Sequence, residues 1–129
     1  MDIPVGTKGR AELLVGAKDT ALSAGSGDLE VLATPRMVAL MEEAASRSVV
    51  SFLEDGCTTV GTRIDTAHLA ATPVGMRVWA ESTVTAVEGK KISFAVEAFD
   101  EAGPIGQGTH ERFIVNAERF LAKCQAKIQ

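Results

Sequence analysis

The spacing of hydrophobic residues changes once along this chain, and that change limits the folds open to it. From Thr34 onward, apolar side chains recur at every third or fourth position, which predicts a helix of about five turns. We expect Thr34 to be the N-cap and Pro35 the first helical residue, with residues 54–56 ending the helix. After Cys57 the spacing becomes two, which predicts strands near 58–70, 76–88, 91–100 and 105–116.

Shorter signals flank this region. Residues 8–15 predict a first strand, and residues 117–128 predict a last short helix capped by Asn116. The order β-α-β-β-β-β plus a C-terminal helix predicts one α+β domain over residues 1–129. In such a domain the long helix lies across one face of a curved antiparallel sheet, the outline of the hotdog fold. Periodicity alone also fits cystatin-like and other helix-on-sheet folds.

Composition limits the kinds of partner that we expect this protein to bind. The net charge is −4, and Lys and Arg are interspersed with acids, so we expect no nucleic-acid partner. The N-terminus lacks the features of a signal peptide, and no stretch approaches about 18 uncharged apolar residues, so we expect no membrane partner. Cys57 and Cys124 have no paired spacing, which indicates reduced thiols in a cytoplasmic protein.

Two neighbouring glutamates on the helix point in different directions. Glu43 has Arg47 four residues later, the favourable order for a solvated ion pair. Glu42 shares its face with small and apolar residues such as Val38 and Val49, where an unpaired carboxylate is costly. An edge glutamate that reaches water and a functional carboxylate are about equally favoured by this spacing.

His68 is the second polar residue in an apolar setting. Strand alternation places it on the face of Val60, Thr62 and Ile64, opposite Arg63. A core histidine with its hydrogen bonds satisfied is one interpretation, and an acid or base with a pKa near neutrality is the other. An inward Glu42 and an inward His68 could meet across one interface.

Thr34 fits a plain N-cap, yet its hydroxyl would also lie where the helix dipole favours a developing oxyanion or thiolate. His110 alternates with Arg112 on a strand face that we expect at the surface. The sequence has no P-loop, GxGxxG, HExxH or GxSxG pattern, and its isolated His and Cys residues make no zinc site. We therefore expect no metal and no cofactor.

Several segments carry a family resemblance. They are Thr34 with Glu42 eight residues later, Gly61 with His68 seven residues later, and the stretches 70–75, 87–91 and 106–112. In these segments the chain resembles the fluoroacetyl-CoA thioesterase family of hotdog enzymes. The resemblance implies a homodimer or dimer of dimers with acyl-CoA at the subunit interface. It also implies that Thr34, Glu42 and His68 cleave the thioester, and that Gly61 and Arg112 lie around the substrate.

In the chemistry that the resemblance implies, Glu42 is nucleophile or general base, His68 manages protons, and the Thr34 hydroxyl attacks or polarises. Attack by water and attack through an acyl-enzyme both stay open. The family member specialised for fluoroacetyl-CoA carries phenylalanines just before the catalytic threonine, whereas residues 25–33 here contain none. We therefore expect a small or medium acyl-CoA substrate without fluoroacetyl specificity.

Two other functions stay open for such a domain. One is a non-catalytic module that binds acyl-CoA, because fold does not determine function. The other is a hotdog hydratase or dehydratase acting on β-hydroxyacyl thioesters. Release of free CoA separates the expected hydrolase from both.

Overall fold

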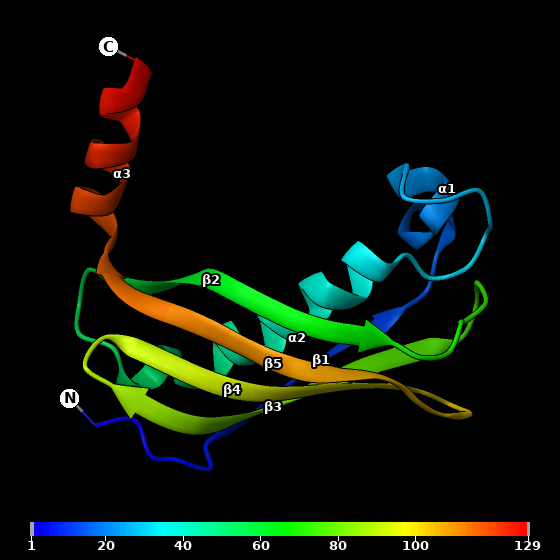
Figure 1. Cartoon of the computed structure of the whole chain (residues 1–129), viewed down its shortest axis with the longest axis horizontal. Coiled ribbons are helices and arrows are strands. Elements are labelled where there is room, and N and C mark those ends of the chain that lie inside the picture. The colour runs from blue at the N-terminus through cyan, green and yellow to red at the C-terminus, as the bar shows by residue number, and fades with distance from the viewer. Residues whose placement is uncertain (1, 129) are drawn as a thin grey trace.

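A computed structural model describes residues 2–128 as one long helix held against a five-stranded sheet (Figure 1). The helix is α2 (Thr34–Val49), which continues into a 3-10 turn, η2 (Val50–Phe52). The strands are β1 (Lys8–Leu14), β2 (Cys57–His68), β3 (Arg77–Glu88), β4 (Lys91–Asp100) and β5 (Gly103–Asn116). The segment between β1 and α2 holds η1 (Ala17–Asp19) and α1 (Ala21–Ala24), and α3 (Ala117–Gln125) with η3 (Ala126–Ile128) follows β5.

The strands are all antiparallel and lie in the order β1-β3-β4-β5-β2. The sheet curves around α2, whose contacts are most numerous with β1 and β3 (Figure 1). This arrangement confirms the hotdog fold, the element order and the approximate strand positions predicted from the sequence. The sequence pattern missed the short helices η1 and α1, because each has too few residues to show a helical period.

The core forms between the apolar face of α2 and the inner face of the sheet. From α2 it contains Met37, Leu40, Met41, Ala44, Ala45 and Val49, all fully buried. Strand β1 comes closest to the helix at Gly9, where an added Cβ would collide with the Ala44 carbonyl oxygen and lie 2.7 Å from Ser48 Cβ. A residue without a side chain is therefore needed at Gly9.

Strand β2 contains a bulge that changes which side chains face α2. Its register with β5 shifts between Gly61 and Arg63. Before the bulge Thr59 and Gly61 face inward, and after it Ile64 and His68 do. The expectation that Val60 lies on the face of His68 was therefore wrong, because the extra residue inverts the alternation.

The start of α2 differs from the prediction. The N-cap is Ala33, whose carbonyl oxygen accepts from the Arg36 and Met37 amides, and no side chain caps the helix. Thr34 is already the first helical residue, so its hydroxyl is free for another partner. Asn116 does cap α3, as predicted, because its side chain accepts from the Arg119 amide.

Helix α3 stands away from the body of the molecule at the end of β5 (Figure 1). Every residue from Glu118 to Ile128 is exposed. Among the described residues, no helix is long and apolar enough to cross a membrane.

Candidate active site

Thr34 and His68 form a hydrogen-bonded pair at one end of the sheet. Thr34 Oγ1 lies 2.8 Å from His68 Nδ1. The helix start supplies the threonine and the last residue of β2 supplies the histidine. A hydroxyl within hydrogen-bond distance of an imidazole is the arrangement that activates an oxygen nucleophile, because the ring can accept its proton.

Burial favours the neutral form of the His68 ring. Desolvation lowers the pKa of His68 below its usual 6.5, and the Ala70 backbone opposes this with a smaller effect. The ring is therefore mostly uncharged at neutral pH and able to accept a proton. The second ring nitrogen, Nε2, is buried and has no hydrogen-bond partner among the described residues.

An open pocket of about 310 Å³ adjoins this pair. Its walls are mainly small and apolar, with the polar groups of Thr34, His68 and Ser26 among them. The apolar lining residues are Ala21, Val31, Leu32, Leu69, Ala70 and Ala71. A pocket that is mostly apolar, with a few convergent polar groups, suits an acyl chain whose reactive carbon meets the hydroxyl.

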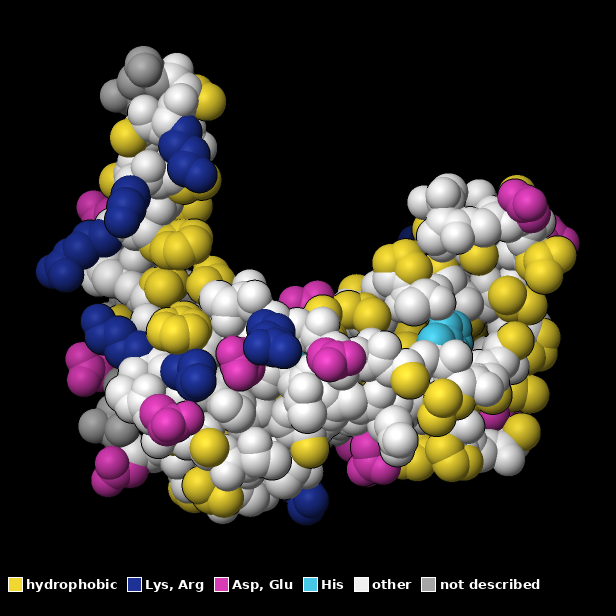
Figure 2. Space-filling view, in the orientation of Figure 1, with side chains coloured by type: hydrophobic (Ala, Val, Ile, Leu, Met, Phe, Trp, Pro, Cys, Tyr) yellow, Lys and Arg dark blue, Asp and Glu magenta, His cyan; other side chains and the backbone are white. Residues whose placement is uncertain are grey.

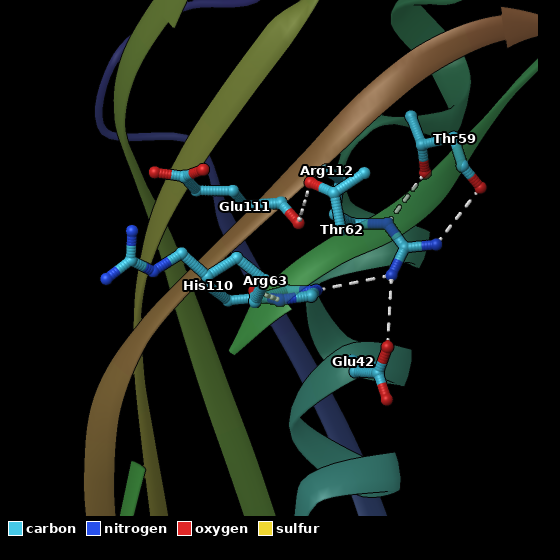
Figure 3. Close-up of polar contacts among 7 residues, drawn as sticks. All are labelled: Glu42, Thr59, Thr62, Arg63, His110, Glu111 and Arg112. Atoms are coloured by element: carbon cyan, nitrogen blue, oxygen red, sulfur yellow. Dashed lines mark hydrogen bonds and ion pairs between the residues drawn. The ribbon is translucent and has the colours of Figure 1, made fainter. Parts of the chain in front are cut away.

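A second polar cluster lies around Glu42, farther along α2 (Figure 3). Glu42 Oε2 is 3.7 Å from Arg112 Nη1, and the Glu42 side chain remains 40% exposed. The carboxylate therefore sits at the edge of the helix stripe and stays open to another group. Glu43 points outward and pairs with Arg47 at 2.9 Å, as predicted.

Arg112 is the most tightly held member of this cluster. Its Nε donates to Thr59 Oγ1 at 2.8 Å, and its Nη2 donates to the Thr59 carbonyl oxygen at 3.0 Å (Figure 3). Burial lowers the pKa of Arg112, and the Glu42 carboxylate raises it in partial compensation. The guanidinium is therefore fixed as a fork, with Nη1 aimed at Glu42.

His110 corrects the sequence-based expectation of a surface position. It is 1% exposed, and Arg112 beside it is 7% exposed. His110 Nδ1 donates to the Arg63 carbonyl oxygen at 2.7 Å, so Nε2 is left to accept from Arg112 Nη1 at 3.2 Å. Burial is the main cause that lowers the pKa of His110, which suits this neutral form.

The surface prediction for His110 failed because two glycines share its strand face. A Cβ at Gly106 would lie 2.7 Å from Met37 Sδ, so this glycine marks the close approach of α2 rather than an exposed face. Glycines opposite a helix are the sequence signal that could have placed His110 and Arg112 inside.

Gly61 completes the second cluster. A Cβ at this position would lie 2.7 Å from Glu42 Oε2 and 3.2 Å from Arg112 Nη1. The missing side chain leaves the space that the carboxylate occupies. Gly61 and Glu42 therefore lie directly beside each other.

The two clusters do not meet within one chain. Gly61 and His68 both belong to β2, and their separation of seven residues spans roughly 20 Å of strand. Thr34 and His68 therefore form one half of the predicted constellation, and Glu42, Gly61 and Arg112 form the other. Over residues 2–128, no group of three or more His, Cys, Asp or Glu side chains could hold a metal ion.

Known proteins share both the sequence pattern and the fold. The profile of the fluoroacetyl-CoA-specific thioesterase family matches residues 15–118. The fluoroacetyl-CoA thioesterase of Streptantibioticus cattleyicolor is 44% identical over 98 residues, which make up 76% of this chain and 70% of that protein.

Solved structures agree with this relationship. A structure of the fluoroacetyl-CoA thioesterase FlK has a TM-score of 0.92 at 35% identity and covers 98% of both chains. A Thermus thermophilus protein described as a thioesterase superfamily member has a TM-score of 0.90 at 31% identity, over 97% of this chain and 93% of that one.

Fold and relatives together define a hotdog-fold thioester hydrolase. The chain belongs to the fluoroacetyl-CoA-specific thioesterase family.

Proposed function

We propose that this enzyme hydrolyses small or medium acyl-CoA thioesters in the cytoplasm, with Thr34, Glu42 and His68 as catalytic groups. The 2.8 Å contact between Thr34 Oγ1 and His68 Nδ1 beside an apolar pocket carries the proposal. Gly61 and Arg112 act at the substrate. Gly61 leaves space for the Glu42 carboxylate, and Arg112 orients that carboxylate.

The Thr34 hydroxyl supports either of two routes. In the first it attacks the thioester carbon, loses its proton to His68 and forms an acyl-enzyme that water then cleaves. In the second it polarises the carbonyl oxygen while Glu42 activates a water molecule. In the first route the protonated His68 then gives its proton to the departing CoA thiolate. In the second route Glu42 holds the proton that it takes from water and can pass it to the thiolate.

A homodimer would bring the two clusters together. Strand β2 is an edge strand of 12 residues, so one side of its backbone lacks a neighbouring strand in the part of the chain that the structure describes. Exposed edges of this length tend to pair with another strand. Antiparallel pairing of two β2 strands about a two-fold axis would set Gly61 and Glu42 of one subunit near His68 of the other.

The acyl group preference follows from the segment before α2. Residues 25–33 contain no aromatic side chain, so no phenylalanine from this segment closes over the pocket. The relatives are named for fluoroacetyl-CoA, but the pocket here leaves room for other acyl groups. We therefore propose that acetyl-CoA and slightly longer acyl-CoAs are hydrolysed at least as well as fluoroacetyl-CoA.

Thiol release over a panel of acyl-CoAs tests this function. Wild-type protein should release free CoA, while Glu42→Gln and His68→Ala should lose at least about a hundredfold in kcat. Glu43→Gln is the matched control, because Glu43 faces outward against Arg47, and its rate should match wild type.

Three results would contradict the proposal. Binding of acyl-CoA without turnover would indicate a binding module. Loss of water from a β-hydroxyacyl-CoA without CoA release would indicate a dehydratase. A strong preference for fluoroacetyl-CoA over acetyl-CoA would overturn the predicted specificity alone.

A further inference from the structure

Helix α3 presents an apolar stripe that no other residue within 2–128 covers. Phe120 is 44% exposed, Leu121 60% and Ile128 83%. The helix has nine residues and contacts the rest of the chain almost only at the end of β5. Isolated helices of this length are marginal in water, so packing against another surface is needed to stabilise α3.

The position of α3 relative to β2 suggests what that surface is. Cys57, the first residue of β2, pairs with Asn116 directly before α3, so the helix rises at the start of the edge strand. The segment Thr20–Ala33, which contains α1, rises at the opposite end of β2 on the same side (Figure 1). The surface between them is hollowed, with the β2 edge as its floor (Figure 2).

Two copies of this shape are complementary. A two-fold axis through paired β2 edges sets the start of each strand beside the end of its partner. The raised α3 of each copy then reaches the raised segment 20–33 of the other. Both walls carry exposed apolar side chains, since Leu22 is 54%, Leu29 68% and Leu69 62% exposed at the α1 end.

The charges on the two walls are also complementary. Helix α3 and η3 carry Arg119, Lys123 and Lys127 and only one acid, Glu118. The segment Thr20–Ala33 contains Asp28 and Glu30 and no basic residue. A basic helix against an acidic segment favours this register and disfavours contact between like ends.

We propose that α3 docks on segment 20–33 of a second copy of this chain and forms the roof of its Thr34–His68 pocket. This inference rests on the homodimer of the proposed function. Phe120 then supplies the aromatic cover that residues 25–33 lack, with Leu121 beside it. The acyl pocket is closed by the partner subunit, and the acyl-chain preference depends on α3.

Crosslinking of the natural thiol on α3 tests the docking. The test uses a variant with two substitutions. Cys57→Ser leaves Cys124 on α3 as the natural thiol, and Leu29→Cys adds a thiol on the proposed partner surface. A short bismaleimide should join two chains through Cys124 and position 29. Val5→Cys is the matched control, because Val5 is 67% exposed and lies outside segment 20–33, and it should give no crosslinked dimer.

Light scattering and thioester hydrolysis on the same preparation separate the possible failures. A dimer that hydrolyses acyl-CoA but crosslinks no better at position 29 than at position 5 overturns the docking and leaves the proposed function intact. A monomer overturns both the docking and the composite site. Equal crosslinking after Cys124→Ser also overturns the docking, because another nucleophile would then be reacting.

The KM for an acyl-CoA substrate tests whether α3 covers the acyl pocket. Phe120→Ala with Leu121→Ala should raise the KM for butyryl-CoA by about tenfold and change kcat less, since the lost contacts bind the acyl chain. Glu118→Gln lies on the same helix outside the stripe and should keep the wild-type KM. An unchanged KM in the double variant of a protein that remains dimeric contradicts the roof.

Discussion

Thr34 Oγ1 lies 2.8 Å from His68 Nδ1, although 34 positions separate the two residues. The contact exists because Ala33, and not Thr34, is the N-cap of α2. The hydroxyl of a capping threonine would accept a hydrogen bond from a backbone amide of the first turn. The shift of one residue leaves that hydroxyl available to the imidazole, and this is how the helix start becomes part of the candidate site.

The pH dependence of hydrolysis should report on His68. Burial lowers the pKa of His68 below its usual 6.5, so the neutral ring that accepts a proton persists to lower pH. We expect kcat/KM to be constant near neutrality and to fall as the pH drops through this lowered pKa. A pH profile with its acidic midpoint at or above 6.5 would contradict the assignment.

Gly61→Ala should impair catalysis more than folding. The new Cβ would lie 2.7 Å from Glu42 Oε2, and the flexible carboxylate would have to move away from Arg112. We expect kcat to fall at least about tenfold while the free energy of unfolding changes by less than about 1 kcal/mol. Thr58→Ala, at an exposed position of the same strand, is the control and should retain both values. Wild-type kcat in Gly61→Ala would show that Glu42 does not need its present position.

His110→Ala should destabilise the fold. The substitution removes a buried ring that stacks on Phe94, together with its hydrogen bonds to the Arg63 carbonyl oxygen and Arg112 Nη1. We expect a loss of about 3 kcal/mol in the free energy of unfolding, measured with urea. A loss below about 1 kcal/mol would mean that the His110 contacts contribute little.

The stability of the wild type should also vary with pH through His110. Its folded-state pKa is lowered, so the unfolded chain binds the proton more readily. The contribution to stability is therefore complete above pH 6.5 and declines as the pH falls from there toward the folded-state pKa. His110→Gln should show a shallower decline over the same range, and an unchanged slope would contradict this origin.

The sequence predicted the fold well because its main signals are long. Helix α2 has sixteen residues with helical spacing, and strands β2–β5 have ten to fourteen residues with alternate spacing. Segments of this length leave little ambiguity between helix and strand. The inward position of His68 followed from the same spacing, whereas Glu42, which we expected to face inward, lies at the edge of the helix stripe with 40% of its side chain exposed. Local devices were harder to predict, since one extra residue at the β2 bulge inverts the alternation before it.

The buried His110–Arg112 pair shows where sequence reasoning reached its limit. Two polar residues beside glycines look like a surface strand until the helix opposite them is known to contact the sheet. Their burial depends on hydrogen bonds that they donate to Thr59 and Arg63, which are about 50 positions distant in sequence and adjacent only in the sheet. The division of the site into two clusters along β2 is likewise a property of the sheet and not of the residue spacing.

A mixed dimer tests the composite site most directly. His68→Ala and Glu42→Gln chains with different affinity tags are expressed together, and the heterodimer is isolated through both tags. One of its two sites then contains wild-type Thr34, His68 and Glu42, so about half of the wild-type kcat should return although each parent homodimer is inactive. A heterodimer no more active than its parents would contradict a site shared between two subunits.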